Sequence, residues 1–507
     1  GEYDEAGRDL LPNLAELTPA MVALAIAARL GRFYSSETMQ QRVAWIERKE
    51  QALARPSNVI ERVPHFCSGC PHTTSTRVPE GSHALGGIGW HYMATWMPDR
   101  ETHTFTQMGG EGATWIGQAP FTETKHVFQN LGDGTYFHSG IMAIRAAVAA
   151  DVNITYKILY NDAVAMTGGQ PIDGSLSVED LIHQLRGEGV RRIALVSDQP
   201  GEWRGRFRSV PGYSLHHRDE LDSLQKELRE FRGTSVIIYQ QTCAAEKRRR
   251  RKKGTLEDPA RRLFINEEVC EGCGDCSIKS NCLSVLPLET ILVRKRQIDQ
   301  SACNKDYSCA NGFCPSFVTV LGGSLRRSSA VTAESEALFR PLSEPVLPDL
   351  ERPWNIVVAG VGGTGVLTVT ALVAMAAHVE GRGCATLNQT GRAQKFGAVV
   401  SHVRVGSHQE DILAVRIPAG EADLFIGCDL VVSATYEAMG KVSRGRSHAV
   451  VNSAEVPTAA STDGVQGARA QRVLRDQGVA SLLLDSDEPL LTRLQISKPN
   501  RSRNRHL

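Results

Sequence analysis

Seven cysteines are concentrated between residues 270 and 314 of this 507-residue chain. Three of them, Cys270, Cys273 and Cys276, are separated by two residues each, which places three sulfur atoms on one tight loop. A cubane iron–sulfur cluster requires this arrangement of thiolates. A structural zinc site usually combines two separate Cys-x2-Cys pairs instead. The spacing therefore favours an iron–sulfur cluster over zinc or unligated thiols.

The other cysteines of this segment fit a second cluster. In ferredoxins with two clusters, the fourth cysteine of each run crosses to the other cluster and is usually followed by proline. Cys314, which precedes a proline, would therefore complete the first site. The second site would then be formed by Cys282, Cys303, Asp306 and Cys309. Asp306 takes the place of the middle thiol, and we expect its carboxylate to bind iron; otherwise it is a solvated loop residue and the second site is empty.

A further group of residues has the types and spacing that a magnesium-bound diphosphate needs. Mg²⁺ takes hard oxygen ligands, which the Asp133 carboxylate, the Asn161 side chain and the Ala163 carbonyl would provide. Glycines let the backbone approach phosphate, and a helix beginning near Ser139 would direct its N-terminus at the anion. The alternative is a glycine turn and a strand-end asparagine without a ligand. The expected site consists of Gly132, Asp133, Gly134, Ser139, Asn161, Ala163, Gly168 and Gly169.

A second glycine-rich turn follows the strand-like run WNIVVA and opens an apolar helix. Its spacing, G-x-G-G-x-G, is typical of a dinucleotide- or phosphate-binding loop in this context. The same glycines would equally serve close packing of the helix on the strand. The residues concerned are Gly360, Gly362, Gly363 and Gly365.

Composition and charge argue against several classes of protein. Lys and Arg number 57 against 56 Asp and Glu, so no global field attracts nucleic acid or membrane. The longest apolar stretch, from Val366 to Val379, is too short to span a bilayer. The acidic N-terminal sequence lacks the apolar core of a signal peptide. With cysteines at ligand spacing, these features predict a cytoplasmic protein whose thiols bind metal.

The elements that must position these residues alternate as in an α/β protein. Short apolar runs such as ITYKILYN (154–161) and RIALVSD (192–198) alternate with helical stretches, which predicts a mainly parallel sheet. Near the N-terminus, Thr18 and Pro19 indicate the start of a helix. The charged run EKRRRRKKG (246–254) is interpreted as a solvated linker, with a nucleic-acid-binding or localisation signal as the alternative.

Several segments resemble the 2-oxoacid:ferredoxin oxidoreductase family, most closely its long fused bacterial members of the indolepyruvate type. The GDG turn with its later asparagine resembles the thiamine-diphosphate motif, and NQTGRAQKFGAVVSHVRVG resembles the gamma domain of these enzymes. The resemblance extends over nearly the whole chain up to about residue 490. The segments that carry it are CSGCPH (67–72), MGGEGATWIGQAPF (108–121), NDAVAMTGGQP (161–171) and YQQTCAAEKRRRRKKG (239–254).

The resemblance implies oxidative decarboxylation of an aryl 2-oxoacid to the acyl-CoA and CO2. It implies thiamine diphosphate, Mg²⁺ and two [4Fe-4S] clusters as cofactors, coenzyme A as co-substrate, ferredoxin as electron acceptor, and a homodimer when complete. It also implies a preceding domain, whose glutamate activates the aminopyrimidine. The chain begins without methionine and ends on a polar tail. We therefore expect a fragment at both ends that is inactive alone.

The expected fold class is α/β. It comprises a doubly wound parallel sheet that binds thiamine diphosphate, a small ferredoxin-like iron–sulfur module and a Rossmann-like gamma domain. The expected boundaries are 1–60 for a helical segment, 61–245 for the thiamine-diphosphate domain, 246–258 for a basic linker, 259–325 for the iron–sulfur module, 326–352 for a second linker, 353–490 for a truncated gamma domain and 491–507 for the tail.

Three further cysteines flank the expected thiamine-diphosphate domain. By the resemblance, Cys67, Cys70 and Cys243 stand where related enzymes hold another cluster near the thiamine. Those enzymes have one more cysteine between them, and here Trp90 stands at its expected place. A reduced structural cysteine pair is the alternative to a cluster.

Two histidines, His72 and His138, are candidate catalytic contacts to substrate or cofactor. A single histidine in a turn is more often a structural hydrogen-bonding residue, so that alternative stays open.

Two rival functions are considered. A non-oxidative thiamine-dependent decarboxylase would have no use for the one-electron carriers that the cysteines predict. A zinc-containing nucleic-acid-binding module would use the basic run instead. Absorbance near 400 nm, which iron–sulfur proteins show and zinc proteins lack, would separate these possibilities.

Overall fold

The computed structural model describes residues 7, 9–12, 17–54, 60–165, 174, 176–325, 347–388, 396–453, 465–476 and 481–484. They fall into two compact units. One consists mainly of His65–Arg326, and the other of Gly1–Pro64 with Arg327–Val456 and Asp463–Leu507. No helix in these described ranges is long and apolar enough to cross a membrane.

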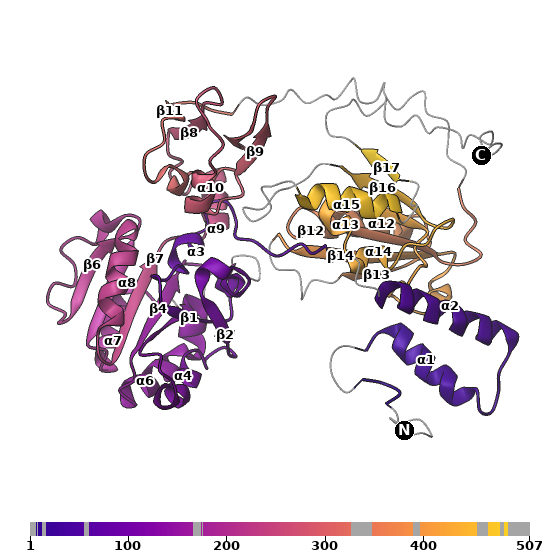
Figure 1. Ribbon diagram of the computed structural model, residues 1–507, viewed down its shortest axis with the longest axis horizontal. Helices are drawn as coiled ribbons and strands as arrows, with labels where there is room; N and C mark the ends of the chain where they lie inside the picture. Colours follow the sequence, from indigo (N-terminus) through magenta and orange to yellow (C-terminus); the bar gives the residue numbers. More distant parts are fainter. Residues whose placement is uncertain are drawn as a thin grey trace. The chain divides into compact units, whose positions relative to one another are not determined.

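The first unit contains a seven-stranded sheet in the order β2-β1-β3-β4-β7-β5-β6, and every pair of neighbours is parallel (Figure 1). The central strands are almost continuously buried, as expected when helices cover both faces. The predicted parallel sheet is therefore confirmed. The strands are β1 (His83–Gly86), β2 (Thr102–Phe105), β3 (Val127–Gly132), β4 (Ile154–Tyr160), β5 (Arg192–Ser197), β6 (Tyr213–His217) and β7 (Thr234–Gln240).

Helices α7 (Val178–Gly187) and α8 (Leu221–Arg229) pack on opposite faces of this parallel-sheet domain. Alternate β5 residues show this, because Leu195 lies in the same apolar cluster as α7 and Val196 in the cluster of α8. The other helical segments of the unit are α3 (His72–Ser75), η1 (Trp90–Trp96), η2 (Pro98–Arg100), α4 (Ala113–Gln118), η3 (Ala119–Phe121), α5 (Asp133–Thr135), η4 (Tyr136–Gly140), α6 (Ile141–Ala149), η6 (Pro200–Trp203), η7 (Arg218–Glu220) and α9 (Ala244–Lys252).

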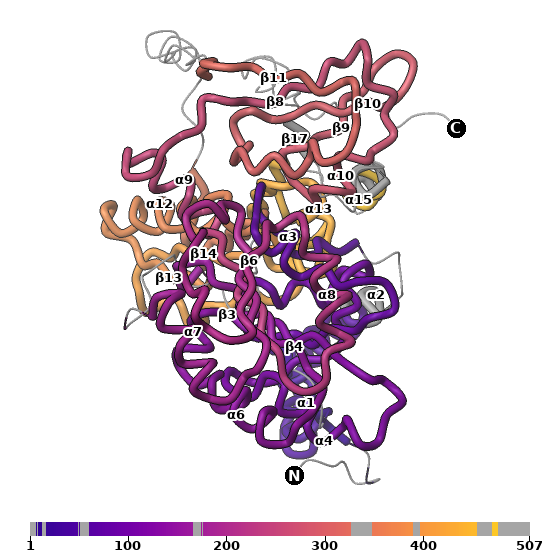
Figure 2. The backbone as a smooth tube through the Cα atoms, turned by 90° about the vertical axis from the view of Figure 1, so that its left-hand side faces the viewer, coloured from indigo at the N-terminus to yellow at the C-terminus, as the bar shows by residue number. Residues whose placement is uncertain are grey.

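Helix α9 contains most of the basic run and differs from the solvated linker expected at 246–258. It lies between the parallel-sheet domain and the cysteine-rich segment in both views (Figures 1 and 2). Lys247 pairs with Asp198 at 2.9 Å, on the sheet side. Arg251 donates to the Asn304 carbonyl at 2.9 Å, on the cysteine side. The charges of this run therefore join two parts of the chain.

The segment 259–325, which we call the cysteine module, has two short antiparallel strand pairs, β8 with β11 and β9 with β10. The apolar cluster around its thiols contains only three buried residues, Leu263, Ile265 and Ile298. Four cysteines pack against that cluster, so the ligands expected for iron are also part of the core. The module's elements are β8 (Arg261–Ile265), α10 (Asp275–Ser280), β9 (Val285–Glu289), β10 (Arg294–Ile298), η8 (Ser308–Ala310) and β11 (Phe317–Leu321).

The second unit has a six-stranded mixed sheet in the order β13-β14-β12-β15-β16-β17. The strand that follows the glycine turn and helix α12, β13, pairs with β14 and does not lie beside β12. β14 runs antiparallel to both of its neighbours. The unit is thus α/β, as predicted, but this edge departs from a parallel Rossmann arrangement. The strands are β12 (Trp354–Val361), β13 (Gly383–Asn388), β14 (Ala398–Gly406), β15 (Leu424–Gly427), β16 (His448–Asn452) and β17 (Ser481–Leu484).

Helices α1 and α2 belong to the same unit as this mixed sheet. The cap expected for α1 is present, because the Thr18 hydroxyl accepts from the Met21 N–H at 3.2 Å. The helical segments of the unit are α1 (Pro19–Leu30), α2 (Glu37–Ala54), α12 (Val366–Val379), η9 (Gln409–Asp411), α13 (Leu430–Ser433), α14 (Tyr436–Met439) and α15 (Val465–Asp476).

Candidate functional site

The GDG turn lies at the carboxyl end of β3, at the edge of the sheet where ligands bind in doubly wound folds. Helical structure begins directly at Asp133, six residues before the start expected near Ser139. It runs through a π-helical turn, η4, into α6, and such turns are frequent at functional sites. Gly134 faces open space, because no atom lies within 4 Å of the position a Cβ would take.

The Asp133 carboxylate is buried and held by backbone N–H groups. Its Oδ1 accepts from Gly134 at 2.9 Å, and its Oδ2 accepts from Asn161 at 2.8 Å and Asp162 at 3.0 Å. Burial raises the pKa of the Asp133 carboxyl to about 6, although these donors act in the opposite direction. A nearby cation would stabilise the charged form of this carboxylate.

Asn161 follows β4, the strand that pairs with β3, so it comes close to the GDG turn. Its Oδ1 is buried and has no hydrogen-bond partner among the described residues. Ala163 is also buried. A buried oxygen without a donor, next to a buried carboxylate, fits the hard-oxygen ligand set of Mg²⁺. Gly168 and Gly169 lie outside the described residues, so their predicted role cannot be placed.

The thiols predicted for the second cluster come together in the cysteine module. Cys282, Cys303 and Cys309 line one small cavity, and Asp306 lines it as well. Burial and the neighbouring thiols raise the pKa of Cys309. Bound iron would favour the thiolate form, so the donor chemistry fits a cluster.

The four thiols predicted for the first cluster are less buried as a group. Cys270 and Cys276 pack against the module's apolar cluster, whereas Cys273 and Cys314 are exposed. The Cys314 sulfur lies 3.0 Å from the Ser316 hydroxyl. The assignment of these four residues stays a prediction.

Two family models match the chain. Residues 86–194, which contain the GDG turn and Asn161, match the C-terminal TPP binding domain of thiamine pyrophosphate enzymes. Residues 355–485 match the pyruvate ferredoxin/flavodoxin oxidoreductase model. Together with the relatives below, these matches support a member of the 2-oxoacid:ferredoxin oxidoreductase family.

The curated relatives of the chain include indolepyruvate oxidoreductase subunits. Subunit IorA of Thermococcus kodakarensis is 25% identical over 338 residues, which cover 61% of this chain and 47% of the relative. Subunit IorB of Archaeoglobus fulgidus is 44% identical over 75 residues, which cover 15% of this chain and 35% of the relative. The chain thus spans about half the length of the IorA relatives it matches.

Among solved structures, 2-oxoglutarate:ferredoxin oxidoreductase from Magnetococcus marinus aligns with a TM-score of 0.27 and 19% identity, covering 37% of this chain and 67% of that chain.

Sequence reasoning missed three buried polar residues of this chain. His91, Glu111 and Asn130 all approach Gly87, just beyond the carboxyl end of β1. The His91 Nε2, the Glu111 Oε1 and both Asn130 amide atoms are buried without a partner in the described part of the chain. Such groups are rare in native interiors and indicate that a ligand contacts this edge of the sheet. Their only sequence signal was the glycines around them.

The charge states of this group follow from its burial. Burial, with the neighbouring His72 and Lys157, lowers the pKa of His91 to about 3, so its imidazole is neutral near pH 7. Burial also raises the pKa of Glu111, whose Oε2 accepts from the Gly109 N–H at 2.6 Å. These groups can hold or exchange a proton where no bulk water competes.

The two predicted catalytic histidines lie in different settings. His72 is buried, and its ring centroid lies 5.7 Å from that of His91, so it adjoins the missed group. His138 is exposed, and its Nδ1 lies 2.8 Å from the Ser139 hydroxyl. Ser139 in turn packs on Gly109, where a Cβ would approach the hydroxyl oxygen to 2.2 Å. A catalytic role for either histidine stays a prediction.

Cys243 adjoins the diphosphate site, because its backbone N–H donates to the Asn161 carbonyl at 3.0 Å. Cys67 and Cys70 lie on one turn, closed by a bond from the Cys70 N–H to the Cys67 carbonyl. Trp90 begins the short helix η1. Whether these thiols hold a cluster stays a prediction.

The glycine turn of the second unit combines close packing with special backbone geometry. A Cβ on Gly360 would approach Val366 Cγ2 to 2.7 Å and Cys428 Cβ to 2.9 Å, so this glycine lets α12 pack on β12. Gly363 and Gly365 have φ angles of +87° and +101°, which favour glycine, and face open space. Gly362 bonds through its N–H to the Gly397 carbonyl at 2.8 Å.

Proposed function

We propose that this chain provides the diphosphate-binding and electron-transfer parts of an indolepyruvate-type 2-oxoacid:ferredoxin oxidoreductase. The observation that carries the proposal is the buried pair of Asp133 and Asn161 at the carboxyl edge of the sheet. The Asp133 carboxylate accepts from the Asn161 backbone N–H, and the Asn161 amide oxygen has no partner among the described residues. The names of the IorA and IorB relatives support the substrate class.

In this proposal Asp133, Asn161 and the Ala163 carbonyl would hold Mg²⁺, which would neutralise the charge of the diphosphate. Thiamine diphosphate would supply nucleophilic carbon chemistry toward 2-oxoacids. The N-terminus of the helix that begins at Asp133 stabilises the anionic diphosphate. Glu111 and His91 offer a carboxylate oxygen and a neutral imidazole to the bound ligand, and their burial excludes water.

The cysteine module provides one-electron chemistry. The predicted thiols would hold two [4Fe-4S] clusters, and such clusters supply single-electron carriers. We further propose ferredoxin as the acceptor, coenzyme A as co-substrate and a homodimeric complete enzyme. The second unit, with its glycine turn, would contribute to coenzyme A binding.

The decisive experiment measures binding of thiamine diphosphate with Mg²⁺ by calorimetry. It uses this chain together with the thiamine-activating domain that the family supplies. Asp133→Asn should weaken cofactor binding at least about 100-fold, because an oxygen ligand and a negative charge are lost. Asp162→Asn is the matched control, since that neighbouring carboxylate is exposed and pairs with Arg250. Equal affinity in Asp133→Asn and wild type would refute the assignment.

A further inference from the structure

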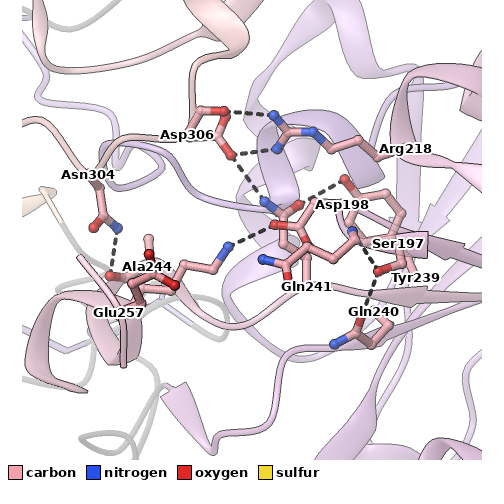
Figure 3. Close-up of polar contacts among 12 residues, drawn as sticks. Ser197, Asp198, Arg218, Tyr239, Gln240, Gln241, Ala244, Glu257, Asn304 and Asp306 are labelled. Atoms are coloured by element: carbon pink, nitrogen blue, oxygen red, sulfur yellow. Dashed lines mark hydrogen bonds and ion pairs between the residues drawn. The ribbon is translucent and has the colours of Figure 1, made fainter. Parts of the chain in front are cut away.

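Asp306 of the cysteine module has specific partners on the parallel-sheet domain (Figure 3). Its Oδ1 lies 2.5 Å from Arg218 Nη1 and accepts from Gln241 Nε2 at 3.0 Å. Arg218 Nη2 also donates to the Asp306 carbonyl at 2.7 Å. The side chains of the ion pair are only 11% and 12% exposed, so solvent screens them little.

The partners of Asp306 are themselves fixed on the sheet. Gln241 directly follows β7, and its side-chain oxygen accepts from the buried Tyr239 hydroxyl at 3.0 Å. The Gln241 N–H donates to the Tyr160 carbonyl at the end of β4. Arg218 begins η7, immediately after β6. Asp306 therefore binds residues at the ends of two strands, β6 and β7, and one of these residues, Gln241, is bonded to the end of β4.

This geometry conflicts with iron ligation by Asp306. A carboxylate that is already neutralised by a buried guanidinium, with a second donor on the same oxygen, is a poor ligand for iron, and a carboxylate is harder than the cluster prefers. We propose that Asp306 is not an iron ligand but the residue that anchors the cysteine module to the thiamine-binding sheet, with Arg218 as its counter-charge. The inference rests on the proposed function only in taking Cys282, Cys303 and Cys309 as the thiols of the second cluster.

The anchored surface also contains the loop of Cys67 and Cys70. A Cβ on Gly69, between these cysteines, would approach the Asp306 Cβ to 2.9 Å, and its φ of +66° requires glycine. Gly69 also lines the same small cavity as Cys282, Cys303 and Cys309. The anchor thus holds the second thiol set against the turn that contains Cys67 and Cys70.

A second pair of contacts follows the same surface. The Ser284 hydroxyl lies 2.8 Å from the Ser68 hydroxyl, and His65 Nε2 lies 3.0 Å from Asn281 Oδ1. Arg77 and Arg251 also donate to carbonyls of the module, those of Ile278 and Asn304. Among these contacts the Arg218–Asp306 pair joins two charged side chains, and such pairs are the stronger ones. We therefore expect loss of the ion pair to loosen the whole surface.

Charge inversion separates an anchor from a ligand. The full chain is prepared anaerobically with iron and sulfide as wild type, Asp306→Asn, Arg218→Gln, and the double variant Asp306→Arg with Arg218→Asp. Hydrogen exchange of segments 66–70 and 303–309 is followed by mass spectrometry, together with iron content and electron paramagnetic resonance. Lys279→Gln, which removes an exposed ion pair with Asp275 in the same module, is the control.

If Asp306 anchors the module, Asp306→Asn and Arg218→Gln should change hydrogen exchange in the same way. Exchange in both segments should be about tenfold faster, iron per chain and the resonance spectrum should stay as in wild type, and the double variant should return exchange to within about twofold. Lys279→Gln should exchange as wild type does.

Two results would overturn the anchor. One is loss of iron or a new oxidised three-iron signal in Asp306→Asn but not in Arg218→Gln, which would identify a ligand. The other is unchanged exchange in both single variants. If wild type takes up no iron, the proposed electron-transfer function fails, while the exchange comparison still decides whether Asp306 anchors the module.

Discussion

Asp133 combines burial with three N–H donors, and this combination has a measurable pH dependence in the metal-free chain. Its folded pKa of about 6 lies above the ordinary value of 3.8, so the folded state binds the proton more tightly than the unfolded state does. Stability contributed by this group therefore falls as pH rises from about 4 to about 6 and is constant above. The accumulated cost is on the order of 3 kcal/mol.

We predict that Asp133→Asn removes this fall of stability with rising pH. Unfolding midpoints of the metal-free chain, measured from pH 5 to 8, should fall between pH 5 and 6 in wild type and stay level in the variant. The exposed neighbour Asp162 supplies the control. Asp162→Asn should keep most of the wild-type slope, because burial raises the pKa of Asp133 more than the charge of Asp162 does. Parallel curves for wild type and Asp133→Asn would show that this carboxyl titrates normally.

Among individual residues, the sequence predicted those site residues that stand in a recognisable short motif. Asp133 and Asn161 stand in a glycine turn and at a strand end, and the structure places both at one sheet edge. His91 and Glu111 were missed because an unpartnered buried atom is a property of the assembled fold. Sequence predicted Asp306 as an iron ligand and did not reveal its ion-pair partner, because Arg218 is 88 residues away in sequence.

At the scale of elements, the alternation of apolar runs predicted the parallel sheet because buried parallel strands are apolar on both faces. It did not predict that β14 runs antiparallel to β12 and β13, since the direction of a strand in its sheet depends on contacts with strands that are distant in sequence. The basic run was interpreted as solvated because like charges repel. In α9 the acceptors that compensate them, Asp198 and the Asn304 carbonyl, come from both sides of the helix.

Helix α9 supports a prediction of its own. Arg251→Gln should lower stability by about 1 to 2 kcal/mol, because a buried carbonyl of the cysteine module loses a charged donor. Lys252→Gln is the matched control, since that neighbouring side chain is exposed. Thermal unfolding of both variants checks whether Arg251→Gln is the less stable one. Equal midpoints would restore the solvated-linker interpretation.

The glycine turn allows a second comparison of neighbours. Gly360→Ala should destabilise the chain by about 3 kcal/mol, because the new methyl group would meet the side chains of Val366 and Cys428 at under 3 Å. Gly363→Ala should cost only about 1 kcal/mol, from its left-handed backbone in open space. Denaturant midpoints should follow this order. The reverse order would mean that close packing is not the role of Gly360.

At the scale of the whole molecule, iron content tests how many clusters the chain holds. Anaerobic protein should contain about eight irons per chain if two cubanes form, or about seven if the second stays in a three-iron form. The double variant Cys67→Ser with Cys70→Ser should not change this number if, as the family resemblance predicts, Trp90 stands where related enzymes have the further thiol. A value near twelve in wild type would show that a third cluster forms beside the thiamine domain.

The cysteine module has a small apolar cluster of three buried residues, with four thiols packed around it. When ligands are also core residues, binding free energy is folding free energy. If the module binds clusters as proposed, chains made when iron is scarce would fold this segment less stably and expose it to cellular proteases. Iron supply would then affect the lifetime of the polypeptide as well as its redox competence.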